Sequence, residues 1–194
     1  GLITTAGFRD VLEIMRTNRS NMYDLQQEKP QPHVAREWRR EINARMNYQG
    51  ESLIEVDSSE VRAIANDFKN AGISTVAICL LHAYANSAHE ETIAKILEQE
   101  IEDINISLSS DVSRVWREFE RTSTTVSNAA TKPIVSTYLE RLEELLEARD
   151  FSGRVLIMQS NGGVAKITSV VPITTLLSGP CAGSEAGMQI ANSA

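Results

Sequence analysis

The chain has 194 residues, of which 42% are hydrophobic and 23% charged, and its net charge at neutral pH is −7. With 26 Asp and Glu against 19 Lys and Arg, and 5% aromatic residues, it lacks the basic, ring-bearing face of a nucleic-acid-binding protein. Its longest apolar stretch, at residues 75–81, is far shorter than the roughly 20 residues that cross a bilayer. The cysteines are only two and far apart, Cys79 and Cys181, which favours a reducing, cytoplasmic compartment.

The first half of the sequence begins with a short β-branched segment and an apolar helical pattern. We expect a strand at residues 1–5, a helix over residues 8–15, and a loop with two prolines over residues 18–32. Residues 36–46 and 53–56 predict a hairpin with one face exposed to water.

A strand–helix alternation follows this hairpin. Asp57 is a typical N-cap for a helix that ends at Gly72, and the nearly continuous apolar run 73–81 predicts a strand buried on both faces. A second helix through residues 93–101 and a strand at 104–108 complete a βαβ-like order, which indicates parallel pairing.

The second half changes to one long helical pattern, from about residue 120 to 149. Pro133 is expected to kink or restart this helix, and its run of glutamates predicts a solvated face. The remaining elements expected from the pattern are a strand at 154–159, a turn at 160–163, a strand at 173–177 and a final helix from Ser178. A domain boundary is expected near residues 120–132.

Ser178, Gly179, Pro180 and Gly183 mark the junction between the last expected strand and the final helix. Proline suits the first turn of a helix, and the free N–H groups at a helix N-terminus favour anions. Glycines that merely permit close helix packing explain the pattern equally well, because it is neither a dinucleotide-binding nor a P-loop motif.

Two further segments are weaker candidates for a binding site. Asn161, Gly162 and Gly163 follow an expected strand, and the edge of a sheet is where ligands bind in α/β folds, although a plain turn is the safer interpretation by about two to one. Arg121, among hydroxyl residues at a helix start, either caps the helix in an ion pair or faces a cleft between domains.

Metal and nucleophile sites have little support. His82, His89 and Glu90 do not have a recognised ligand spacing, so no metal site is predicted. Cys181 near a helix N-terminus is a weak nucleophile candidate, because no histidine neighbours it, and Cys79 is expected in the core.

Taken together, several strings resemble the hydantoinase A and 5-oxoprolinase family. These strings are Gly1-Leu2-Ile3-Thr4-Thr5-Ala6-Gly7-Phe8-Arg9-Asp10-Val11-Leu12-Glu13-Ile14, Tyr23-Asp24-Leu25, Leu81-His82-Ala83-Tyr84-Ala85-Asn86, Glu120-Arg121-Thr122-Ser123-Thr124-Thr125-Val126, Met158-Gln159-Ser160-Asn161-Gly162-Gly163 and Leu176-Leu177-Ser178-Gly179-Pro180. The resemblance runs through the whole chain. It implies an α/β fold with mixed sheets and helices, part of an actin-like, ribonuclease-H-like ATPase architecture.

The resemblance also implies an activity and its cofactors. Family members use ATP and Mg²⁺ to activate a cyclic amide such as a hydantoin or 5-oxoproline for hydrolysis, or to carboxylate a ketone. Asn161, Gly162, Gly163, Ser178, Gly179, Gly183 and Arg121 would then contact the nucleotide. The implied partners are a small cyclic amide or ketone and a second subunit of the hydantoinase B type, or further copies of the chain.

One departure from the family is informative. The Asp-x-Gly-Gly-Thr phosphate loops are not in this sequence, which opens at Gly1 without an initiator Met. We therefore expect an internal piece, with residues 1–125 from the N-terminal domain and 126–194 from the start of the main domain, that binds Mg²⁺-ATP weakly or not at all. A non-enzymatic module that contacts another subunit is the alternative.

Overall fold

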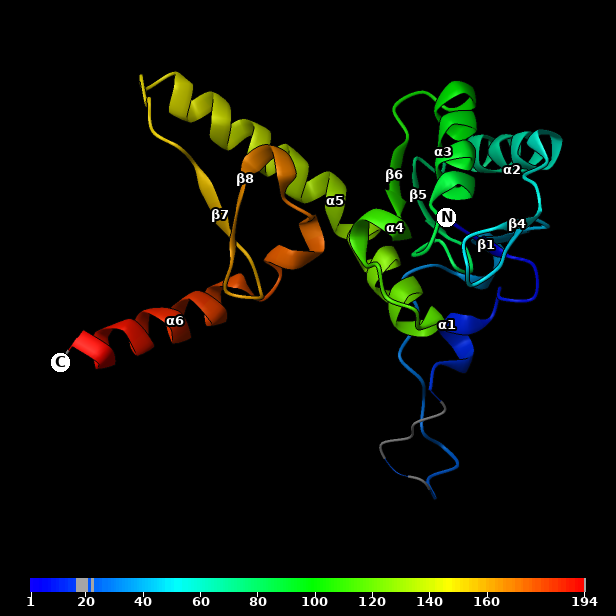
Figure 1. Cartoon of the computed structure of the whole chain (residues 1–194), viewed down its shortest axis with the longest axis horizontal. Helices are drawn as coiled ribbons and strands as arrows, with labels where there is room; N and C mark the ends of the chain where they lie inside the picture. The colour runs from blue at the N-terminus through cyan, green and yellow to red at the C-terminus, as the bar shows by residue number, and fades with distance from the viewer. Residues whose placement is uncertain (17–20, 22, 194) are drawn as a thin grey trace. The chain divides into compact units, whose positions relative to one another are not determined.

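The computed structural model describes residues 1–16, 21 and 23–193, which form two compact units, residues 1–130 and 131–194. The first unit contains β1 (Leu2–Thr5), α1 (Val11–Ile14), η1 (Arg36–Trp38), β2 (Arg39–Ile42), β3 (Arg45–Met46), β4 (Ser52–Ile54), α2 (Ser58–Asn70), β5 (Thr75–Cys79), α3 (Ala88–Glu100), β6 (Asn105–Leu108) and α4 (Ser109–Val112). The long helix α5 (Glu118–Glu147) begins in the first unit and ends in the second. The second unit also contains β7 (Leu156–Met158), β8 (Val164–Lys166), η2 (Ile167–Ser169), η3 (Pro172–Thr175) and α6 (Ser178–Ser193) (Figure 1).

A four-stranded parallel sheet organises the first unit. Its order is β2-β1-β5-β6, and Leu2 of β1 lies opposite Arg39 on one side and Ala77 on the other. The chain leaves β1 toward β2 at one edge and leaves β5 toward β6 at the other, so β1 and β5 are neighbours whose connections diverge. The predicted α/β class and parallel pairing are confirmed.

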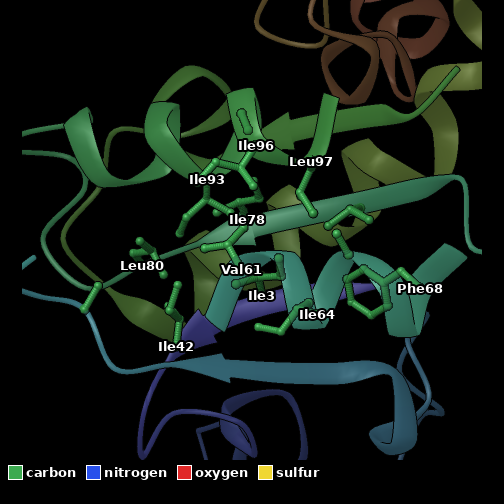
Figure 2. Packing of buried hydrophobic residues seen from close by; sticks show 14 of the residues in the cluster. Ile3, Ile42, Val61, Ile64, Phe68, Ile78, Leu80, Ile93, Ile96 and Leu97 are labelled. Carbon is green, nitrogen blue, oxygen red and sulfur yellow. The ribbon is translucent and has the colours of Figure 1, made fainter. Parts of the chain in front are cut away.

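One face of this sheet carries the main core. Val61, Ile64 and Phe68 recur at helical spacing along α2 and are buried against the sheet, together with residues of α3 (Figure 2). Asp57 starts α2 as predicted, because its Oδ1 accepts a hydrogen bond from the Ser59 N–H at 2.8 Å. Gly72, with φ +68°, follows the helix in the left-handed region that favours glycine.

The opposite face has a smaller core that α1 and α5 cover. Its buried members are Leu2, Leu12, Ala77, Cys79, Val126 and Ala129. Because successive β5 residues alternate between the two clusters, this strand is buried on both faces, as its apolar run predicts, and Cys79 lies in the core.

The second unit is thinly packed. Its hairpin of β7 and β8 is antiparallel, and within its described residues Leu139 and Pro172 are the two that are buried. The glutamates of α5 that the sequence assigned to a solvated face are exposed there: Glu140, Glu143, Glu144 and Glu147.

The structure corrects four local predictions. Residues 36–46 do not form one hairpin: β2 joins the parallel sheet, and the antiparallel pair is limited to β3 with β4. Residues 173–177 do not form a strand: η3 is a 3-10 helix there, and β8 pairs with β7 instead. The first helix is shorter than expected, at Val11–Ile14. Of the two effects expected at Pro133, a kink or a restart, the restart is wrong, because Pro133 lies inside the continuous helix α5.

Two other expectations are not tested by the structure. Of the expected loop at 18–32, residues 18–20 and 22 lie outside the described residues. The expected boundary between residues 125 and 126 falls inside α5, and where the domains of a longer protein divide stays a prediction. Among the described residues, every helix is too short or too polar to cross a bilayer.

Candidate functional site

The predicted turn at Ser160–Gly163 is confirmed as the connection between β7 and β8. Gly162 has φ +82°, a conformation that L side chains rarely adopt, and the Gly163 N–H donates to Asn161 Oδ1 at 2.9 Å. The Gln159 N–H donates to the Gly163 carbonyl at 2.8 Å and closes the turn. Asn161 and Gly163 are exposed, so their polar groups face solvent.

Ser160 ties this turn to the segment before α6. Its N–H and its hydroxyl both donate to the Thr174 carbonyl at 2.6 Å, and its Oγ accepts from the Leu177 N–H at 3.1 Å. A Cβ on Gly162 would lie 3.7 Å from Cys181 Sγ. The two glycine-containing segments therefore lie side by side within the second unit.

The start of α6 leaves open space beside its glycines. A Cβ on Gly179 or Gly183 would meet no heavy atom within 4 Å, and both residues are exposed. Ser178 is half-buried, and its hydroxyl donates to the Thr175 carbonyl at 2.8 Å. Within the described chain no element packs against these glycines, so both sequence interpretations, a ligand site and close packing of another backbone, stay open.

Arg121 lies in the first unit, inside a buried polar network, and not among the residues above. It is 1% exposed, and its Nη1 donates to Ser109 Oγ at 2.9 Å. Ser109 Oγ in turn donates to Glu90 Oε1 at 2.6 Å. The guanidinium also lies over the Tyr84 ring, 5.7 Å from its centroid.

Glu90, which the sequence analysis considers only as a metal ligand, has a structural role that was not predicted. It is fully buried, and its carboxylate also accepts the N–H groups of Leu80 and Ser110, each at 2.9 Å. Burial raises the pKa of the Glu90 carboxyl, and these donors oppose that rise. A signal existed in the sequence, because Glu90 shares the apolar face of α3 with Ile93 and Leu97.

The histidines do not join Glu90 in a metal site. His89 Nε2 lies 3.0 Å from Ser52 Oγ, and His82 Nδ1 lies 3.1 Å from Tyr84 Oη. The described residues contain no group of three or more His, Cys, Asp and Glu that could hold a metal ion. Cys181 is half-buried, and all three histidines of the sequence belong to the first unit, so the second unit has no imidazole base for it.

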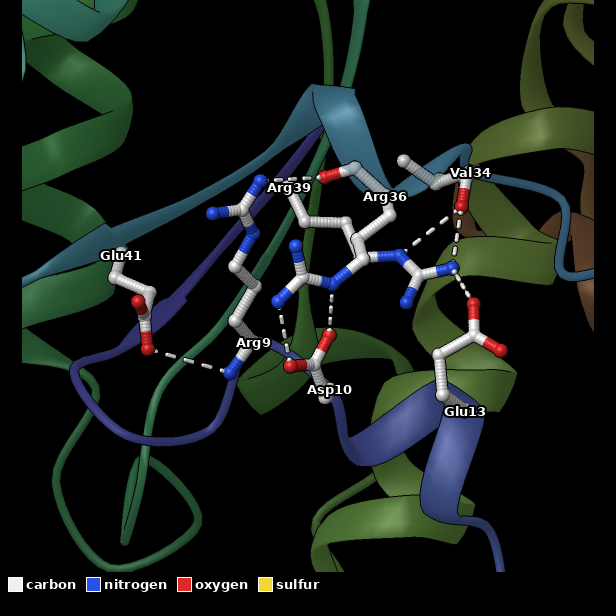
Figure 3. A network of polar contacts seen from close by, with 7 residues as sticks. All are labelled: Arg9, Asp10, Glu13, Val34, Arg36, Arg39 and Glu41. Atoms are coloured by element: carbon white, nitrogen blue, oxygen red, sulfur yellow. Dashed lines mark hydrogen bonds and ion pairs between the residues drawn. The ribbon is translucent and has the colours of Figure 1, made fainter.

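A second polar network in the first unit has a structural role (Figure 3). Arg39 is 1% exposed at the start of β2, where its Nε and Nη2 donate to the Val34 carbonyl at 3.0 and 2.8 Å and its Nη2 pairs with Glu13 at 2.8 Å. Arg36 pairs with Asp10 at 2.7 Å, and this hydrogen bond lowers the pKa of the Asp10 carboxyl. These pairs attach residues 34–36 to α1.

Comparison with known proteins covers the whole chain. The family described as "Hydantoinase/oxoprolinase N-terminal region" matches residues 1–101, and the family described as "Hydantoinase/oxoprolinase" matches residues 121–193. An uncharacterized protein of Methanocaldococcus jannaschii is 37% identical over 94% of this chain and 27% of its own length. The caprolactamase subunit alpha of Pseudomonas jessenii is 29% identical over 98% of this chain and 28% of its own length. The acetophenone carboxylase gamma subunit of Aromatoleum aromaticum is 26% identical over 99% of this chain and 28% of its own length.

A solved structure agrees with these matches. The crystal structure of the ATP-dependent caprolactamase from Pseudomonas jessenii superposes on all of this chain with a TM-score of 0.89 and 28% identity, over 28% of its own chain. The chain thus spans little more than a quarter of the length of these relatives, and its fold is that of an ATPase-type enzyme. The two family matches, which follow one another along the chain, and the shared fold show that the chain belongs to the hydantoinase/oxoprolinase family.

Proposed function

We propose that the chain is part of a longer ATP-dependent enzyme that hydrolyses a cyclic amide. This proposal rests on the superposition of the whole of this chain on part of an ATP-dependent caprolactamase. The open space beside the glycines at the α6 N-terminus supports it. In such an enzyme, ATP supplies a phosphoryl group that activates the amide carbonyl toward hydrolysis. Carboxylation of a ketone is the second candidate, since a carboxylase subunit is a relative over 99% of the chain.

The residues proposed to contact the nucleotide are Asn161, Gly162, Gly163, Ser178, Gly179 and Gly183. Gly179 and Gly183 present backbone without a side chain, so a phosphate or ribose can approach the helix closely. The N-terminus of α6 also carries N–H groups and a positive dipole end that favour an anion. Arg121 acts in this proposal as a residue that orders the first unit through Ser109 and Glu90.

The 194-residue chain alone is proposed to bind Mg²⁺-ATP weakly, because it lacks Asp-x-Gly-Gly-Thr phosphate loops. The caprolactamase and acetophenone carboxylase relatives are named as subunits. A second subunit is therefore proposed as a partner that completes the substrate site.

The test uses the complete protein and alanine substitutions that this fold tolerates. Gly179→Ala and Gly183→Ala add a Cβ in open space, and alanine is favoured over glycine inside a helix by about 1 kcal/mol. We expect unchanged or higher stability but at least about tenfold weaker ATP binding by calorimetry. Gly187→Ala, two turns into the same helix and equally open, is the matched control and should leave ATP binding unchanged.

The reaction is assigned by the substrate that stimulates ATP hydrolysis. Lactams and imides are compared with ketones plus bicarbonate, using the complete protein with its second subunit. Stimulation by a cyclic amide supports the first candidate, and stimulation by a ketone supports the second. An absence of Mg²⁺-ATP binding by the complete protein would remove the ATPase assignment altogether.

A further inference from the structure

The carboxyl edge of the four-stranded sheet in the first unit holds a further candidate site. β1 and β5 are neighbours whose following connections run to opposite sides of the sheet. In open α/β sheets, such a divergence leaves a crevice outside the carboxyl ends of the two strands, and ligands bind there. The sequence analysis did not identify this crevice, because it depends on the strand order.

A small hollow lies at this position. It has a volume of about 10 Å³ and is lined by residues that include Thr4 of β1, Cys79 of β5, Phe8 and Arg121. The Leu81 N–H donates to a β1 hydroxyl at 3.0 Å and fixes the two strand ends beside each other. A volume of this size holds about one water molecule, and therefore one oxygen atom of a ligand.

Arg121 brings an incompletely paired charge to the hollow. Its side chain is 1% exposed, and its Nε–H has no hydrogen-bond partner within the described chain. The link to Glu90 passes through Ser109 and uses the Nη1 nitrogen of the guanidinium. A buried guanidinium with an unused donor is unfavourable unless an acceptor reaches it, and an anionic oxygen is the strongest acceptor for it.

Two further basic residues, Arg45 and His82, lie next to residues that line the hollow. Arg45 lies over the Phe8 ring, 6.0 Å from its centroid, and makes no ion pair with the described residues. His82 follows β5 in a left-handed conformation, φ +59°, which is strained for a residue other than glycine. Burial lowers the pKa of the His82 imidazole, and the charges of Arg45 and Arg121 lower it further. One carboxylate, Glu118, also lines the hollow, and Glu90 is linked to Arg121 through Ser109, so the unused Arg121 donor, and not an excess of positive charge, is what favours an anion here.

We propose that this crevice binds a small oxyanion, the carboxylate or phosphate group of a ligand, with one oxygen in the hollow against Arg121 and the remainder facing Arg45 and His82. The bound group supplies the acceptor that the Arg121 Nε–H lacks. It also offsets the positive charge that destabilises a protonated His82. This site does not depend on the proposed reaction.

The experiment is a titration of the ¹⁵N-labelled 194-residue chain with inorganic phosphate and, separately, with acetate. Ionic strength is held constant with chloride, and the Arg121 Nε–H and His82 ring resonances are followed by NMR. A saturable shift of both groups with either probe is the expected result. The probe that binds more tightly identifies the ligand group as phosphate or carboxylate.

Matched arginine variants separate a built site from general charge attraction. Arg45→Gln is expected to weaken binding about tenfold, because one charge-assisted contact is lost, and Arg45→Lys to restore part of it. Arg62→Gln, on the exposed face of α2 with its side chain 53% exposed, makes the same charge change away from the crevice and should bind as the wild type does. Circular dichroism verifies that each variant is folded. Shifts that do not saturate with either probe, or an equal loss in Arg62→Gln, would overturn the proposal.

Discussion

The two units differ in how their apolar residues are used. In residues 1–130, a parallel sheet buries hydrophobic side chains on both faces, and Phe68, Ile78 and Leu97 are 0% exposed. In residues 131–194, large apolar side chains lie in solvent: Ile134 is 75% exposed, and Leu177 is 66% exposed. An apolar groove of about 460 Å³ runs along α5 and β7 in this second unit. Burial of apolar surface is the main contribution that offsets conformational entropy on folding. We therefore expect the first unit to be the more stable of the two and the second unit to gain stability from further contacts.

Two truncations of aromatic side chains, one in each unit, test this difference and give the largest expected change in stability. Phe68→Ala removes a fully buried ring from the first unit and should destabilise it by about 3–5 kcal/mol. Tyr138→Ala removes a ring that is 64% exposed in the second unit and should change stability by less than about 0.5 kcal/mol. Urea unfolding is followed by tryptophan fluorescence, which reports the first unit because Trp38 and Trp116 both lie in it.

Far-UV circular dichroism and amide hydrogen exchange supply the complementary measurement on the second unit. We expect α6 amides to exchange faster than those of β5, since α6 has no buried residue. Equal protection of the two elements, or equal destabilisation by Phe68→Ala and Tyr138→Ala, would contradict the contrast between the units.

A second prediction concerns the polar part of the first unit. Glu90→Gln removes the buried carboxylate and leaves the Arg121 charge without its compensating group, which should cost about 3 kcal/mol. Glu91→Gln is the matched control, because it makes the same substitution at the adjacent, exposed residue of α3. It should lower the free energy of unfolding by less than about 0.5 kcal/mol. The midpoints of urea unfolding measure both. Similar midpoints for the two variants would show that the Glu90 network is not a determinant of stability.

The smallest effect concerns the cap of α2 and its pH dependence. Asp57→Ala should lower the melting temperature of the first unit by roughly 2–5 °C, because a helix N-terminal N–H loses its acceptor. Hydrogen bonds from the Ser59 hydroxyl and N–H lower the pKa of the Asp57 carboxyl relative to the unfolded chain. The stabilising contribution is therefore fully present above the unfolded pKa of about 3.9 and is lost as pH falls through the lower, folded pKa.

The corresponding measurement compares wild type and Asp57→Ala at two pH values. The difference in melting temperature between them should be full at pH 6 to 7 and should shrink at acid pH, where Asp57 protonates in the folded state. A difference that stays constant over this range would show that the cap does not depend on the charge of Asp57.

Several elements could be predicted from the sequence because their cause is local. α2 has an N-cap, a periodic apolar face and a terminal glycine within one short segment, and β5 is a continuous apolar run that only a strand buried on both faces explains. The turn at Asn161–Gly163 has the glycine that its positive φ requires. The family resemblance rested on strings of residues and is confirmed by the family matches.

Other features could not be predicted because distant parts of the chain determine them. β2 has four residues and β8 has three, so neither has enough pattern to choose its partner, and β2 joins β1 in the sheet while β8 pairs with β7. η3 has the β-branched composition of a strand, but Pro172 begins it, and its hydroxyls bond to carbonyls three residues earlier.

The sequence by itself determined the α/β class, the parallel pairing, the two glycine-containing segments and the family, because each of these rests on residue order over short distances. Tertiary structure alone decided that Asn161–Gly163 lies beside the start of α6 and that Glu90, Ser109 and Arg121 share one network. It also decided the crevice between β1 and β5, which exists because strand order reverses there. These contacts depend on which strands pair and which helices pack together across the chain, and short stretches of sequence do not determine those partners.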